Sequence, residues 1–201
     1  MAIRAGLGFK AHTGWAAVVV LAEPSASPTV VATRRVQLAK STDLDRTQVY
    51  HSASKLPAKS AAQLVDETTK EVRQQARSVV NQLIGELKST GWEIAGAGLV
   101  LGNSRLPPKL ETILRSHALI HAAEGDLFRQ ALAAAIQSCG LTMTGLASNE
   151  LFQTAAARLG TKEDALRLRI AQIGKGIRPW AQDQKESALV AWLAMSPAPI
   201  E

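Results

Sequence analysis

The chain is poor in the residues that would assign it to a specialised class. One cysteine, Cys139, occurs among the 201 residues, which excludes an internal disulfide framework and any zinc site built from several thiolates. Apolar runs such as 15–22 are far shorter than the roughly 18 residues of a membrane-spanning helix. No secretory signal is recognisable at the N-terminus. We therefore expect a reduced, cytoplasmic protein that does not associate with membranes.

What is present is the composition of an ordinary globular protein, with 46% hydrophobic and 20% charged residues. The length suits one domain, which we expect to cover about 1–195, followed by a frayed tail at 196–201. The formal charge is +6, and residues 1–60 contribute 8 − 3 = +5 of it. This excess is compatible with phosphate binding or with a solvated sheet edge.

The first 40 residues predict an antiparallel meander of three strands. Two apolar segments, 3–9 and 15–21, flank the turn-like residues 11–14, and 29–38 alternates between apolar and polar side chains. The intervening segment contains Pro24 and Pro28, which cannot donate ladder hydrogen bonds, so we expect a loop there.

A long helix is predicted over about 60–88. Apolar positions recur every three or four residues, and Ser60 with Gln63 resembles a capping box. About 30 residues at 1.5 Å each give a helix near 45 Å long. Such a helix either projects beyond the sheet or pairs with another copy of itself, which would make the protein a homodimer.

The remaining pattern predicts strands at 92–101 and 141–146, helices at about 107–114 and 122–138, and three further helices. Strands reached through helices run parallel. The expected fold is therefore α/β, with a mixed five-stranded sheet, three antiparallel strands followed by two parallel ones, and helices on both faces. This is the architecture of the ribonuclease H-like superfamily.

Two segments carry a closer resemblance. Residues 7–18, LGFKAHTGWAAV, resemble the first hairpin of RuvC-type Holliday-junction resolvases. Residues 183–191, DQKESALVA, resemble the final helix of that family and are also similar to the C-terminal helix of actin-like sugar kinases. The kinase resemblance implies ATP binding between two such domains, whereas this chain has room for one and contains no Walker A motif.

The RuvC resemblance implies carboxylates after the first strand, after the fourth strand and on the last helix, holding two divalent ions for phosphodiester cleavage. Here Lys10 follows the first strand, and the fourth strand ends in Leu101, Gly102 and Asn103. An ammonium cannot ligate a hard cation. Only Glu186, with Asp183 near it, stands where the last helix would supply a ligand. We therefore expect no cofactor, with Mg²⁺ required only if the nuclease alternative holds.

Several residues are candidates for a site. Lys10 and His12, with Arg34, Asn103 and Lys175, are predicted ligand-binding residues that could contact a phosphate or carboxylate. The alternatives are an exposed turn for the first two, a charged edge strand for Arg34 and a helix linker for Lys175.

Glu186 and a second group could be catalytic. His117, His121 and Glu124 are spaced i, i+4 and i+7, which places them on one helix face for zinc binding or acid–base chemistry. Because spacing fixes no third ligand, we assign no metal ligands. Glu186 has an alternative role at N3 of a helix capped by Asp183.

Three functional hypotheses remain. The first is a binding or assembly protein without the two-metal site, whose partner is nucleic acid or another protein. The second is a metal-dependent nuclease, or another enzyme, with a relocated active site. The third concerns assembly alone and is a homodimer formed through the long helix.

Overall fold

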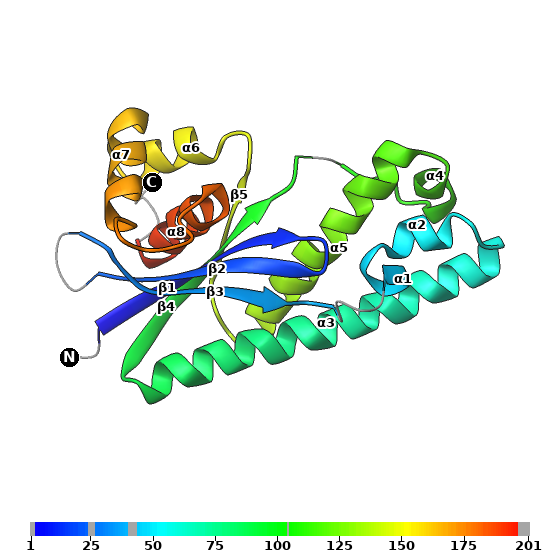
Figure 1. The fold of residues 1–201 in the computed structure, drawn as a ribbon, viewed down its shortest axis with the longest axis horizontal. Helices are drawn as coiled ribbons and strands as arrows, with labels where there is room; N and C mark the ends of the chain where they lie inside the picture. The colour runs from blue at the N-terminus through cyan, green and yellow to red at the C-terminus, as the bar shows by residue number, and fades with distance from the viewer. Residues whose placement is uncertain (1–2, 24–26, 40–43, 104, 197–201) are drawn as a thin grey trace.

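The computed structural model describes residues 3–23, 27–39, 44–103 and 105–196. They form a five-stranded sheet in the order β3-β2-β1-β4-β5 (Figure 1). The strands are β1 Ile3–His12, β2 Trp15–Ala22, β3 Thr29–Gln37, β4 Trp92–Leu101 and β5 Met143–Ala147. The first three pair antiparallel, whereas β4 runs parallel to β1 and β5 runs parallel to β4. The predicted mixed sheet is confirmed.

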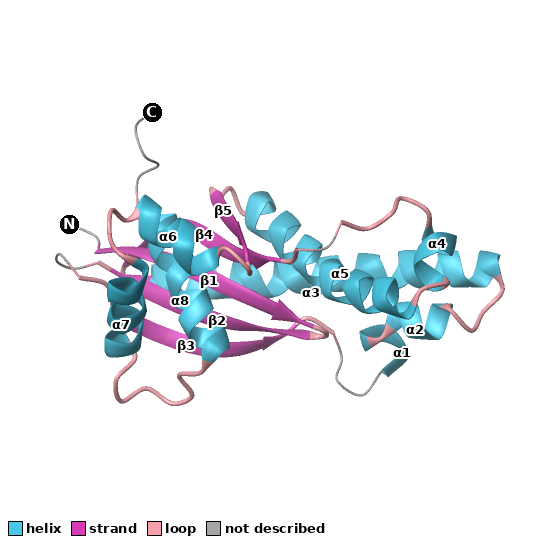
Figure 2. Ribbon diagram, turned by 90° about the horizontal axis from the view of Figure 1, so that it is seen from above, coloured by secondary structure: helices cyan, strands magenta, loops and turns pink. Residues whose placement is uncertain are grey.

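Helices cover both faces of this sheet (Figure 2). They are α1 Leu44–Thr47, α2 Val49–Ala53, α3 Ala58–Ser89, α4 Leu110–Leu114, α5 His117–Ser138, α6 Leu151–Arg158, α7 Glu163–Ile173 and α8 Gln182–Met195. One apolar core lies between the sheet, α3 and α5, and a second lies between the sheet, α6, α7 and α8. Among the described helices, none is long and apolar enough to cross a bilayer.

The long helix α3 extends beyond the sheet, as its length predicts. Its 32 residues span about 48 Å. Figure 1 shows its N-terminal half beside α1, α2, α4 and the start of α5, on the side of the molecule away from α6 and α7. The buried positions of α3 pack against α5, α2 and β4. The apolar stripe that suggested pairing with a second copy is therefore covered within the chain.

Two helix starts differ from the prediction. The helix α3 begins at Ala58 after Pro57, so Ser60 lies inside it and the predicted capping box is wrong. Proline at this boundary is compatible with the helix because the first helical N–H groups need no intrahelical partner. The helix α5 begins at His117, five residues before the predicted start, because Ser116 caps it and its hydroxyl oxygen accepts from the Leu119 N–H at 3.4 Å. The predicted tail from 197 onward lies outside the described residues.

The final helix α8 lies directly on the backbones of β1 and β4. Glycines occupy the strand positions that face it: Gly6, Gly8, Gly96 and Gly98. A Cβ at Gly8 would stand 1.8 Å from the carbonyl oxygen of Ser187, and one at Gly6 would stand 2.3 Å from that of Ala191. Since Ser187 opposes Gly8 and Ala191 opposes Gly6, α8 runs antiparallel to β1. Its N-terminal turns therefore lie at the carboxyl end of β1.

We predict that Gly8→Ala destabilises the protein by about 3 kcal/mol, because a methyl group at this position overlaps the α8 backbone, which cannot rotate away. Urea unfolding followed by circular dichroism measures the change.

The matched control is Gly85→Ala in α3, where nothing lies within 4 Å of the added Cβ. Alanine there should stabilise the helix by about 0.5–1 kcal/mol. Equal effects of the two substitutions would show that α8 does not depend on the glycine contact.

Candidate functional site

The carboxyl end of β1 presents Lys10 and His12 to the face of the sheet that α8 covers. Successive side chains of a strand alternate between faces. Leu7, Phe9 and Ala11 therefore enter the core beneath α3 and α5, whereas Lys10 and His12 stay on the same side as the glycines. Both polar side chains are partly exposed, because the strand ends where α8 begins.

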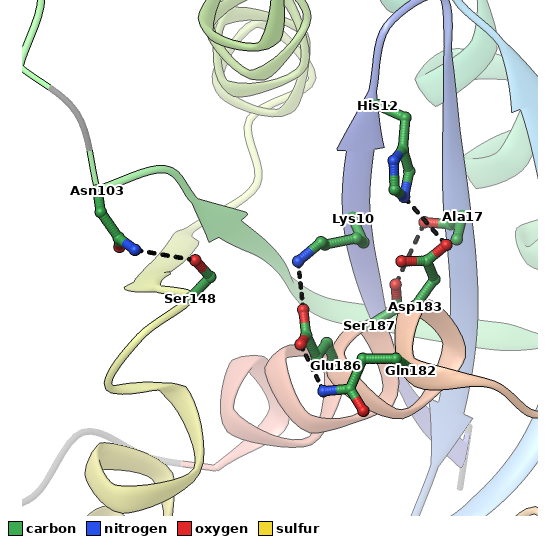
Figure 3. A network of polar contacts seen from close by, with 9 residues as sticks. All are labelled: Lys10, His12, Ala17, Asn103, Ser148, Gln182, Asp183, Glu186 and Ser187. Carbon is green, nitrogen blue, oxygen red and sulfur yellow. Dashed lines mark hydrogen bonds and ion pairs between the residues drawn. The ribbon is translucent and has the colours of Figure 1, made fainter. Parts of the chain in front are cut away.

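Lys10 forms an ion pair with Glu186 of α8 (Figure 3). Its Nζ donates to Glu186 Oε2, and Gln182 Nε2 donates to Glu186 Oε1 at 2.6 Å. The Glu186 side chain is only 9% exposed. Both oxygens of this carboxylate thus have donors, and its charge is balanced by the ammonium group of the same chain.

His12 lies beside Asp183 and a stack of planar groups. Its Nε2 is 3.0 Å from Asp183 Oδ2, within ion-pair distance but without the alignment of a hydrogen bond. The His12 ring stacks on Trp15, with centroids 4.3 Å apart and planes 10° from parallel. The guanidinium of Arg35 lies 3.9 Å from the Trp15 centroid. We call Lys10, His12, Gln182, Asp183 and Glu186 the strand-end site.

The prediction that Asp183 caps α8 and that Glu186 occupies N3 is wrong. The N-cap is Ala181, two residues earlier, and the helix begins at Gln182. The Ala181 N–H donates instead to Gln184 Oε1 at 3.0 Å, so Gln184 satisfies the helix start. Glu186 lies in the second turn and is free for the contact with Lys10.

Asn103 lies beyond the end of β4, where its Nδ2 donates to Ser148 Oγ at 3.3 Å (Figure 3). A cation also lies at this strand end, because the guanidinium of Arg129 occupies the space beside Gly102. Burial lowers the pKa of Arg129, and the nearby carboxylate of Asp126 opposes that shift. Arg129 retains its charge. Cationic side chains thus occupy the carboxyl ends of the two central strands.

Arg34 and Lys175 are placed apart from the strand-end site. Sheet register aligns Lys10 with Ala17 and Ala17 with Arg35, so Arg35 shares the face of Lys10. Arg34 points to the opposite face and donates to its own neighbouring carbonyl at Thr33. Lys175 is exposed in the loop before α8, and no contact among the described residues joins it to the site. Counting paired residues across the two predicted hairpins could have placed Arg35 on the same face as Lys10 from the sequence.

His117, His121 and Glu124 do share one face of α5. That face lies in the region formed by α1, α2, α4, the start of α5 and the N-terminal half of α3, which we call the helical extension (Figure 1). No contact described in the structure joins it to the strand-end site. A third histidine, His51 of α2, joins them. Glu124 is buried, and its Oε1 accepts from the His51 backbone N–H at 3.2 Å and lies 2.9 Å from His51 Nδ1. The sequence spacing of His51 does not indicate that it joins His117 and His121, because only tertiary packing brings α2 to α5.

Neighbouring Tyr50 supports the same packing. Burial raises the pKa of its phenol, with smaller contributions from the carboxylates of Asp126 and Glu124. The hydroxyl therefore stays neutral at physiological pH, which suits its position at the partly buried junction of α2 with the core.

The comparisons with known proteins concern the fold. No protein-family model and no curated sequence match the chain. The structure of Thermus thermophilus RuvC in complex with a Holliday junction substrate is similar, with a TM-score of 0.52 and 12% identity, over 95% of this chain and 91% of that one. A second Thermus thermophilus RuvC structure has a TM-score of 0.50 and 11% identity, over 93% of this chain and 90% of that one. The predicted ribonuclease H-like fold is confirmed as RuvC-like.

We predict that Lys10 and Glu186 are energetically coupled by about 1–3 kcal/mol, because each single substitution leaves a largely buried charge without its partner. Lys10→Met, Glu186→Gln and the double variant form the cycle, and urea unfolding gives the three free energies.

The exposed pair Lys70 and Asp66 on α3 is the control. Lys70→Met should leave the free energy of unfolding unchanged within error, because solvent screens this pair. Additive effects of Lys10→Met and Glu186→Gln would contradict the coupling.

Proposed function

We propose that this chain is a nucleic-acid-binding domain of RuvC-like fold that does not cleave phosphodiesters by the two-metal mechanism. One observation carries the proposal. The place where the RuvC resemblance implies a metal-binding carboxylate holds the ammonium of Lys10, which is paired with Glu186. The chain thereby keeps a positive charge where those enzymes are expected to hold metal cations.

The residues at the strand ends do not fit a pair of Mg²⁺ ions. Mg²⁺ requires oxygen ligands at about 2.0–2.1 Å in octahedral geometry. Lys10 offers no lone pair, and Asn103 offers a single amide oxygen at the end of β4. Of the two carboxylates in the strand-end site, Glu186 already accepts hydrogen bonds at both oxygens, and Asp183 lies beside His12. We therefore assign no catalytic step to Mg²⁺ here.

The surface around the site suits a phosphate backbone. Lys10 and Arg35 share one face, two strands apart, or about 10 Å. Trp15 has His12 on one side and Arg35 on the other, so it orients the guanidinium. Stacking leaves the N–H edge of an arginine available for bidentate contact with phosphate. The similar RuvC structure, which holds a Holliday junction substrate, makes branched DNA the first ligand to test.

The other hypotheses fit the structure less well. A relocated active site built from Lys10, His12, Glu186, His117, His121 and Glu124 would need one cleft, whereas the structure divides these residues between two places. A homodimer through the buried stripe of α3 would require α5 to leave it. We retain the cytoplasm as the proposed location, on the basis of the single cysteine.

We predict that the protein binds a fluorescent four-way DNA junction with an affinity that falls steeply with salt, and that Arg35→Ala weakens binding and lowers the slope of log affinity against log salt by about 1. Fluorescence anisotropy across a salt series measures both quantities. Duplex and single-stranded DNA are compared under the same conditions.

Arg34→Ala is the matched control, because it removes the same charge from the adjacent residue on the opposite face. It should leave the affinity within about twofold of the unsubstituted protein if single phosphate contacts dominate. Incubation of the junction with Mg²⁺ or Mn²⁺ should yield no cleavage products. Cleavage that Glu186→Ala abolishes would establish the nuclease alternative. Absence of binding to all three DNAs would contradict the proposal.

A further inference from the structure

Three of the four histidines in the chain converge in the helical extension, far apart in sequence but adjacent in space. His117 and His121 lie one turn apart on α5, and His51 comes from α2. One ring nitrogen of each lies within 4.8 Å of those of the other two. His117 and His121 are exposed and His51 is partly exposed, so an ion can reach them from solvent.

The three rings meet edge to face and lie at the surface, not in a core. The His117 and His121 centroids are 4.4 Å apart at 89°, and His51 meets His121 at 4.7 Å and 65°. Exposed imidazoles gain little from apolar burial, and they repel one another when protonated. Their convergence therefore favours a ligand that all three can share.

Buried Glu124 gives this cluster the outer contact that metal-bound histidines usually have. Its Oε1 lies 2.9 Å from His51 Nδ1 and also accepts the His51 backbone N–H. A carboxylate beside Nδ1 fixes the imidazole tautomer in which Nδ1 carries the proton and Nε2 keeps its lone pair. The Glu124 side chain is only 4% exposed, so this acceptor is held in a fixed position by the surrounding helices.

We propose that His51, His117 and His121 bind one Zn²⁺ ion, with a water in the fourth position and with Glu124 orienting His51. Three imidazoles plus an open position are an established zinc coordination set. Tetrahedral bonds of 2.0–2.1 Å place ligand nitrogens about 3.3 Å apart, so separations of up to 4.8 Å must close by at most about 1.5 Å. Side-chain rotation of the two exposed histidines supplies this movement. The inference does not depend on the proposed function.

Bound zinc would connect α2 to α5. The two helices already touch, and α2 also packs against α3. Without metal, the cluster contributes no more than ring contacts and the hydrogen bonds to Glu124. With metal, three coordinate bonds would tie the short helix α2 to α5. The metal would add positive charge to this end of the molecule.

Isothermal titration with Zn²⁺ tests the site, using the full chain without a histidine tag after treatment with a chelator. We expect one ion per chain. His121→Asn should weaken binding by about 100-fold or more, and Glu124→Gln by about 10–100-fold. Thermal unfolding of the unsubstituted protein should shift upward with Zn²⁺, and the shift should disappear in His121→Asn.

His12→Asn is the matched control, because His12 is the one histidine outside the cluster. It should retain both the stoichiometry and the affinity. Substitution by Co²⁺ should give the visible absorption of a tetrahedral ion, and a lower pH should weaken binding because protons compete for the nitrogens. The proposal fails if zinc binding survives in His121→Asn and His117→Asn, or if His12→Asn abolishes it.

Discussion

The contact between the backbone of α8 and two strands of the sheet determines the rest of this structure. Glycines at four strand positions allow the helix to approach closer than any side chain would permit. The backbone carbonyl of Ser187, for example, packs directly against the strand backbone at Gly8. The approach sets the height and direction of α8, and therefore where its first turns lie. Asp183 and Glu186 reach the carboxyl end of β1 because the helix is fixed against the strand just beyond them, at Ser187 above Gly8 and at Ala191 above Gly6.

The ion pair of Lys10 with Glu186 follows from that geometry. A carboxylate brought this close to a strand end needs compensation, because desolvation of an unpaired charge is costly. In a metal-dependent enzyme a divalent ion can supply it. In this chain Lys10 does, and Gln182 occupies the remaining oxygen. The compensating charge belongs to a side chain of the protein itself, so under the proposed function no hard cation is needed to balance Glu186.

The sequence predicted what depends on local periodicity and failed where distant segments meet. The apolar segments 3–9 and 15–21, the alternation over 29–38 and the three-to-four-residue spacing in α3 predicted the first elements, and the sheet followed from the rule that helix-connected strands run parallel. The N-cap of α8 was misplaced by two residues because Asp183 is a better capping residue than Ala181, although the Gln184 side chain satisfies the helix start instead. His51 could not be assigned to His117, since no local pattern encodes the packing of α2 on α5.

The two candidate sites differ in the kind of ion they can accept, and this difference follows from their donor atoms. The strand-end site has two carboxylates, Glu186 paired with Lys10 and Asp183 beside His12, so a hard ion that requires several oxygens finds too few ligands there. The histidine cluster presents three nitrogens, which favour zinc and its neighbours over Mg²⁺. Under the two proposals, Mg²⁺ would have no binding site in either place, whereas zinc would bind at one without altering the other. A phosphate ligand near Arg35 and a metal near His121 would therefore act independently.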